Sequence, residues 1–476
     1  MGRFRTRFLA AFLGLSALAP LANAGPSDAA NESVVKVAAP SQAAKQRTYT
    51  LAECLALADR NHPNLWAARA KVAGYHALLD EARWTPFSQW SIDASLSSIA
   101  DLRGAAPYSD ATADDVNTTF KDGFNPWFRM GLRGAIPLYT FGKIESIARA
   151  ARGQIRYGEW DSEKARQETR MAVRKAFYSV MAARDTREHL IDVLGKVDKS
   201  LDSINAKRAK GDPSVEPEDG LRIEFYRDQL RLRASEPDVP EASNMAALRF
   251  MTGVATNFDI PNEHLARPDT TLGPIVSYLS AARLFRPEIN QARAGIVGRV
   301  GQLDFARAKL FPDVGIGVGT GFTVAPSAIT QNGWAPNPYN SNGIGPGFAM
   351  AARWSMDFLP AQARIEAAES ALEEVRSLLR FALGGVAVEV EQTYAAAAEA
   401  QQREARWQHA EEVTRKWLTK VQDGVDLGAT DRRFIMDPLR MYLDARLSHI
   451  IALKEYNIAL ADLARASGWD RTAPSK

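Results

Sequence analysis

The sequence predicts a mainly α-helical protein with a membrane β component. Long helices form a coiled-coil barrel, and four β-strands per chain belong to a larger β-barrel shared between copies. Three observations predict this fold class. A sequence pattern occurs twice along the 476 residues. Two helical patterns run far beyond the roughly 8–20 residues of a globular helix. Two pairs of segments between the helices alternate apolar and polar residues, which is the period of a β-strand.

The internal repeat is visible in two short stretches. Residues 63–74 read PNLWAARAKVAG and residues 287–298 read PEINQARAGIVG, so proline, Ala-Arg-Ala and glycine recur in one register. The match continues further along the chain at Leu79, Asp80, Ala82 and Arg83, which correspond to Leu303, Asp304, Ala306 and Arg307. Such self-similarity indicates a duplicated structural unit.

The N-terminus has the pattern of a secretory signal peptide. Arginines at positions 3, 5 and 7 precede a short apolar run, and Ala22–Ala24 reads ANA, which resembles a cleavage site. The run is too short to span a bilayer as an anchor. We expect residues 1–24 to be a signal peptide and residues 25–47, rich in Ala, Ser, Pro and Asn, to be a flexible leader.

The composition argues against several classes of function. Loss of the signal peptide removes three arginines and no acid, so the formal charge of +3 falls to zero and gives no support for nucleic-acid binding. Cys54 is the single cysteine, which excludes a disulfide framework and suggests a small apolar helix residue. The histidines lack metal-ligand spacing. We therefore expect no metal, no cofactor and no catalysis.

The first predicted hairpin lies in the first half. In WSIDASLS, Trp90, Ile92, Ala94 and Leu96 alternate with Ser91, Asp93, Ser95 and Ser97. After a polar loop rich in Gly and Pro, FRMGLRGAIPL places Phe128, Met130, Leu132, Ile136 and Leu138 on one face and Arg129, Gly131, Arg133 and Ala135 on the other. The pattern predicts two strands with one fully apolar face.

The second predicted hairpin follows the same rule. DVGIGVGTGFTV places Val314, Ile316, Val318, Phe322 and Val324 on one face and Asp313 with four glycines on the other. FAMAARWSMDF places Phe348, Met350, Ala352, Trp354, Met356 and Phe358 on one face and Ala349, Ala351, Arg353, Ser355 and Asp357 on the other. The glycines fit a strand better than a phosphate loop, since no Lys-Ser/Thr follows them.

The four strands, of roughly ten residues each, have the length that crosses a membrane, about 9–11 residues. Alternation alone also fits a soluble two-layer sheet. The signal peptide, the long helices and the tryptophans beside the strands favour a membrane barrel with its apolar face toward lipid. The polar face would then line the barrel lumen with Asp93, Arg129, Arg133, Asp313, Arg353 and Asp357.

The strand number predicts an oligomer. Single-chain barrels begin at about eight strands, and an open sheet edge cannot face lipid. Four strands therefore require further copies of the chain, and three copies supply twelve strands.

The long helices predict a second, helical barrel. One pattern runs from Lys143 to about Arg208 without a proline, and a helix of this length extends roughly 100 Å. The segment Lys210–Gly220 ends it, and a returning helix follows in which we expect breaks at Pro237 and Pro240.

We expect two structural repeats of helices, hairpin, long helix and returning helix. The first covers residues 48–254, with the hairpin at about 86–138 and the long helix at about 142–208. The second covers residues 271–468, with the hairpin at about 312–358 and the long helix at about 361–421. Residues 469–476 form a tail.

Taken together, these segments resemble the TolC-type outer-membrane efflux proteins. The resemblance rests on YTLAECLALADRNHPNLWAARAKV, IPLYTFGKIESIARAA, the paired hairpins and GVDLGATDRRFIMDPLRMYLDARLSHIIALKEYNIAL, in that order. It implies a homotrimer in the outer membrane with a periplasmic helical tunnel, which serves as the exit duct of a tripartite efflux or type I secretion system. The partners implied are a periplasmic adaptor, an inner-membrane pump and outer-membrane lipid. The alternative, a periplasmic coiled-coil scaffold or adaptor, explains the helices but not the strands.

The resemblance also suggests two sites at the periplasmic end. Members of the family have a pair of acids three residues apart at the mouth, and here Phe434 and Asp437 take those positions. Asp431 lies one turn earlier, where it serves equally well as a helix cap. The expected adaptor-docking turns contain Gly424, Asp426, Leu427, Gly428, Gly211 and Asp219.

Overall fold

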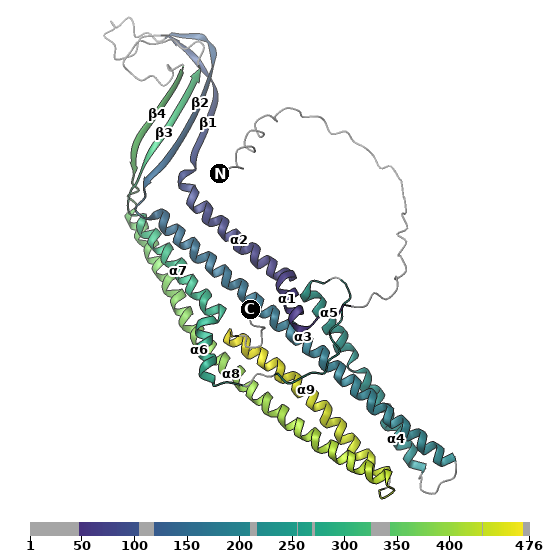
Figure 1. Cartoon of the computed structure of the whole chain (residues 1–476). Coiled ribbons are helices and arrows are strands. Elements are labelled where there is room, and N and C mark those ends of the chain that lie inside the picture. Colours follow the sequence, from purple (N-terminus) through teal and green to yellow (C-terminus); the bar gives the residue numbers. More distant parts are fainter. Residues whose placement is uncertain are drawn as a thin grey trace, which may run out of the picture. The chain divides into compact units, whose positions relative to one another are not determined.

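The structure is a computed structural model (Figure 1) that describes residues 47–103, 119–209, 217–254, 256–268, 272–324, 343–430 and 432–469. The predicted signal peptide, most of the leader, Gly211 and Asp431 lie outside these residues. No helix in the described part of the chain combines the length and apolarity needed to cross a membrane.

The elements alternate between helices and strands in both halves of the chain. The first half contains α1 (Leu51–Asn61), α2 (Pro63–Trp84), the 3-10 helix η1 (Thr85–Phe87), β1 (Gln89–Arg103), β2 (Thr119–Tyr139), α3 (Lys143–Ala209), α4 (Pro217–Ser235) and α5 (Asp238–Thr252). The second contains α6 (Ile275–Phe285), α7 (Pro287–Ala308), β3 (Asp313–Val324), β4 (Gly343–Arg353), α8 (Phe358–Asp426), the 3-10 helix η3 (Arg432–Ile435) and α9 (Met436–Ser467). The predicted fold class, mostly helical with four strands, is confirmed.

The repeated prolines mark helix starts. Pro63 is the first residue of α2 and Pro287 the first of α7, where a missing backbone N–H costs nothing. The residue before each, His62 or Arg286, is extended, as the proline ring requires. The internal repeat therefore forms the same helix–helix junction twice.

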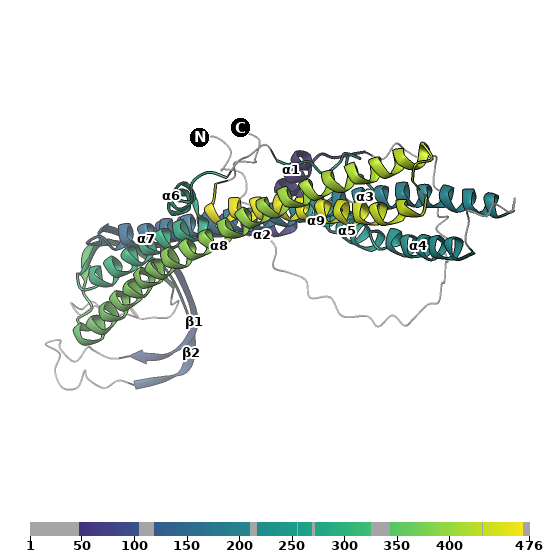
Figure 2. The same cartoon turned by 90° about the horizontal axis from the view of Figure 1, so that it is seen from below.

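The long helices pack side by side. α3 lies against α2 and α7, and α8 lies against α7 and α9, as both views show (Figure 1, Figure 2). Where α3 meets α7, a Cβ on Gly153 would lie 2.4 Å from the backbone nitrogen of Gly298, and a Cβ on Gly301 would lie 2.5 Å from that of Ala150. Glycine is therefore needed for the two backbones to approach this closely.

A buried core holds the short helices on α3. It contains Cys54 and Ala58 of α1, Val180 of α3 and Leu248 of α5, all fully buried. Burial raises the pKa of the Cys54 thiol to about 12, so the thiol stays protonated at neutral pH. Cys54 is thus an apolar packing residue, as the sequence indicates.

The strands form a single antiparallel sheet in the order β1-β2-β3-β4. The hairpins β1–β2 and β3–β4 meet through β2 and β3, where Arg133 lies opposite Gly319. Within the described residues β1 and β4 are the outer strands of an open sheet, and they extend from the ends of the helices (Figure 1).

Several predicted boundaries were wrong. β1 and β2 have 15 and 21 residues rather than about ten, because pairing continues beyond the alternating stretch into its polar end. β4 ends at Arg353, so Asp357 is not a strand residue but directly precedes α8. Pro240 does not break α5, because it lies in the first turn, where a missing N–H is tolerated.

Candidate functional site

One face of the sheet is apolar across all four strands. The register aligns Ile92 with Leu132, and Ile316 with Met350, so the rows across the sheet carry mainly apolar residues on this side, with Thr320 as a polar exception. These side chains are exposed in the single chain: Phe348 is 87% and Met350 76% accessible. A continuous exposed apolar face of this kind marks a surface that meets lipid or a partner.

The opposite face carries the charged and small residues. Five of the predicted lumen residues lie on it, namely Asp93, Arg129, Arg133, Asp313 and Arg353. Arg133 on β2 forms an ion pair with Asp93 on β1, with an N–O distance of 3.1 Å. The sixth, Asp357, pairs instead with Arg364 of α8 at 2.7 Å.

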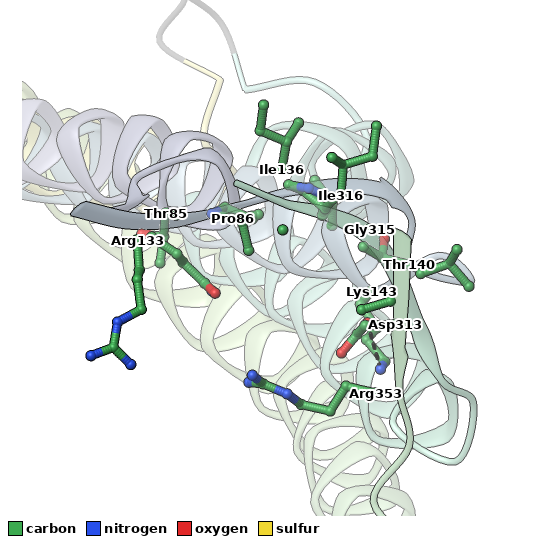
Figure 3. Close-up of a pocket in the computed structure, with 18 of the residues that line it drawn as sticks. Thr85, Pro86, Arg133, Ile136, Thr140, Lys143, Asp313, Gly315, Ile316 and Arg353 are labelled. Carbon is green, nitrogen blue, oxygen red and sulfur yellow. Dashed lines mark hydrogen bonds and ion pairs between the residues drawn. The ribbon is translucent and has the colours of Figure 1, made fainter. Parts of the chain in front are cut away.

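A cavity of about 630 Å³ lies on the charged side, where the sheet meets the helices (Figure 3). The bases of β2, β3 and β4 and the first turns of α3 line it. Its ionisable lining consists of Arg133, Lys143, Asp313 and Arg353.

Aromatic side chains surround the same junction. The Trp90 ring covers Gly134 on the neighbouring strand so closely that a Cβ there would lie 2.1 Å from a ring atom. The indole of Trp90 donates a hydrogen bond to the Phe87 carbonyl at 3.1 Å, and the indole of Trp354 donates to the Leu310 carbonyl at 3.0 Å. Aromatic residues at the edge of an apolar band are typical of the girdle of an outer-membrane barrel.

The turn between α8 and η3 lies at the far end of α8 and α9 (Figure 1). Gly424 and Asp426 belong to the last turn of α8, so placing them in the turn itself was wrong. Leu427 follows with 84% of its side chain exposed, and Gly428 has a left-handed φ of 71°, which favours glycine. The backbone N–H of Ala429 donates to the Gly424 carbonyl at 2.8 Å, which closes the turn.

Asp437 and Phe434 lie just beyond this turn. Phe434 is in η3 with 58% exposure, and Asp437 is in the first turn of α9 and exposed. Asp437 thus lies inside a helix, in the first turn after η3. At this position the helix dipole also favours its negative charge.

The predicted docking surface also includes Asp219 and Gly211 in the first half of the chain, where we expected a turn. Asp219 lies within α4 and not in a turn. Its neighbour in the prediction, Gly211, is outside the described residues.

A buried charged cluster was missed by the sequence reasoning. Glu404 and Glu411 of α8 are 2% and 8% exposed and face Arg446 and His449 of α9. The His449 Nδ1 lies 2.6 Å from a Glu411 oxygen, and the Arg446 guanidinium donates to both Glu411 oxygens at 3.1 Å.

The hydrogen bonds control the charge of this cluster. Burial opposes ionisation of Glu411, but its hydrogen bonds to His449 and Arg446 outweigh burial and lower its pKa. Polar residues seven apart at 404 and 411, and three apart at 446 and 449, interrupt the apolar faces of α8 and α9 and are the sequence signal for this pairing.

Comparison with known proteins assigns the family. The model of the outer membrane efflux protein family matches residues 54–254 and 278–469. This match covers most of the chain, so the chain belongs to the outer membrane efflux protein family. A sequence search among curated proteins finds no match.

Solved structures share the fold. A structure of CusC, from a study of folding and transmembrane channel formation, aligns with a TM-score of 0.70 at 16% identity over 89% of this chain and 93% of that chain. The Campylobacter jejuni CmeC outer membrane channel aligns with a TM-score of 0.65 at 15% identity over 96% of both chains. The open Neisseria gonorrhoeae MtrE outer membrane channel aligns with a TM-score of 0.69 at 15% identity over 89% and 91%.

The protein is therefore an outer-membrane efflux channel of the kind that serves tripartite pumps, and its helices are a periplasmic extension. The predicted family, function and location are confirmed, and nothing supports the alternative of a periplasmic scaffold. Channels of this family are trimeric and work with an adaptor and an inner-membrane pump. The family is one of transport proteins rather than enzymes.

The two sheet faces give a direct prediction. We expect Met350→Arg to reduce assembly in the outer membrane, because a charge on the lipid face of a barrel is destabilising to an extent that depends on its depth. Ala349→Arg, one residue away on the charged face opposite Gly317, should assemble normally. Heat resistance of the assembled protein in outer-membrane extracts measures the difference. Equal assembly of both variants would contradict the assignment of the faces.

Proposed function

We propose that three copies of this chain close a twelve-stranded barrel, with the apolar sheet face toward lipid and the charged face toward the lumen. The observation that carries the proposal is the open sheet, whose outer strands β1 and β4 have one unpaired side each in the described chain. Unpaired backbone groups are not tolerated in hydrocarbon. The required partners are then identical chains, in keeping with the trimeric channels of the family.

Cargo would enter at the tip of the helices and leave through the barrel. In this reading Phe434 and Asp437 of each chain surround the threefold axis, so the mouth combines an apolar constriction with a ring of three carboxylates. Rings of carboxylates favour cations in channels. The chain supplies the duct and no catalysis, so the inner-membrane pump determines the cargo.

The turn after α8 would dock the adaptor. Leu427 is an exposed apolar side chain beside backbone that Gly428 leaves uncovered. An exposed leucine flanked by a glycine turn suits the tip of a helical hairpin, which buries apolar side chains against backbone. The start of α4 at Asp219 is the corresponding place in the first half.

Planar bilayers test the duct function. The purified protein should insert and give discrete single-channel currents. Protein that is embedded in the bilayer and passes no ions under any applied voltage would contradict the proposal.

The carboxylate ring predicts ion selectivity. Asp437→Asn should lower the ratio of potassium to chloride permeability, because it removes three negative charges from one constriction. Asp80→Asn removes the same charge from an exposed position on α2 and should leave the ratio unchanged. Reversal potentials in a KCl gradient measure the ratio. If Asp437→Asn and Asp80→Asn behave alike, Asp437 does not line the mouth.

The exposed leucine predicts the adaptor contact. Leu427→Asp should weaken capture of the cognate adaptor and leave the trimer intact, because it places a charge in an apolar contact outside the core. Val239→Asp places the same charge on α5, where Val239 is 74% exposed, and should retain binding. Cross-linked adaptor and native trimer are both read from membrane extracts. Normal capture by Leu427→Asp would exclude this turn as the docking site.

A further inference from the structure

The cavity at the base of the sheet has an excess of positive charge. Three cationic side chains, Arg133, Lys143 and Arg353, and one acid, Asp313, account for its ionisable lining (Figure 3). Acids within the chain already neutralise some of these cations.

Lys143 forms an ion pair with Asp313, the acid that lies opposite Arg353 in the register of β3 and β4. Asp313 and Arg353 are partners in the β3–β4 ladder. The Lys143 Nζ lies 2.7 Å from the Asp313 carboxylate and donates a second hydrogen bond to the Phe311 carbonyl at 2.9 Å. Lys143 is 15% and Asp313 49% exposed, so this pair is partly shielded and holds the Asp313 charge away from Arg353.

Arg353 therefore keeps its charge free. Its guanidinium has no acidic partner among the described residues, and it is exposed on the charged face of the sheet. Figure 3 shows the Arg353 side chain extending from β4 past the Lys143–Asp313 pair. Arg133 differs, because Asp93 neutralises it at 3.1 Å.

Apolar side chains complete the cavity. Pro86, Ile144 and Ile147 line it together with the hydroxyls of Thr85 and Thr140. A small apolar body fits against these residues while a negative group faces an arginine, since guanidinium groups bind carboxylates and sulfonates through paired hydrogen bonds.

We propose that this cavity is a binding site for organic anions with a small apolar body, on the path of cargo through the barrel. The inference rests on the proposed lumen-facing orientation of the charged sheet face. Three copies of Arg353 then surround the lumen at the level where the helices meet the barrel. The positive collar formed by these three arginines lies at the opposite end of the helices from Asp437.

Block of single-channel current from the barrel side tests the site. The probes are naphthalene-1-sulfonate and its cationic counterpart, naphthalene-1-methylammonium, which share the apolar ring and differ in the sign of charge. The sulfonate should block at lower concentration than the ammonium. Equal block by the two probes would overturn the proposal.

Variants localise the block. In the variant Arg353→Gln, the half-blocking sulfonate concentration should rise by about tenfold, the scale on which charged clefts concentrate counter-ions. Asp93→Asn frees Arg133 and should lower that concentration. Arg222→Gln, an exposed arginine on α4 at the other end of the helices, should leave it unchanged.

The outcomes separate the two proposals. Channels that conduct normally but show the same sulfonate block in Arg353→Gln would overturn the anion site alone. Inserted protein that carries no current would overturn the duct function itself.

Discussion

The unpaired edges of the four-stranded sheet are the constraint on which the rest of the structure depends. In the described chain, β1 and β4 each pair on one side only, and the sheet exposes a continuous apolar face. A sheet edge in hydrocarbon leaves N–H and C=O groups that cost several kcal/mol each. The strands are therefore stable in a membrane only when other chains complete the barrel. Insertion into the membrane thus depends on assembly.

Contacts at the junction fix the sheet to the helices. Trp90 and Trp354 anchor the sheet to backbone carbonyls at its base, and Lys143 joins the start of α3 to Asp313 of β3. Beyond the junction the helices need no membrane. Their contacts are buried apolar cores, close backbone crossings at Gly153 and Gly301, and polar clusters such as the one at Glu411.

The sequence predicts the features that depend on local periodicity. The change from a helical to a two-residue period locates both hairpins, and the prolines at 63 and 287 locate two helix starts. Strand ends are less predictable, because pairing in β2 continues where alternation has stopped. The 3-10 turn η3 that precedes Asp437 is not indicated by any periodicity.

Contacts between distant segments could not be predicted from one sequence. Lys143 and Asp313 are 170 positions apart, and nothing local pairs them rather than Asp313 with its strand neighbour Arg353. The same holds for Glu411 and His449, which meet because α8 and α9 are antiparallel neighbours. Which arginine of the charged sheet face stays unpaired depends on such contacts, so only the structure shows it.

The most direct test of the shared barrel is disulfide cross-linking between its edge strands. In a Cys54→Ala background, Ala349→Cys on β4 is combined with single cysteines placed in turn at Ser91, Ser95 and Ser97 along β1. At least one combination should yield a covalent trimer in outer membranes under oxidising conditions, with no larger species. A protein that is inserted in the membrane and remains a monomer in every combination would contradict the account.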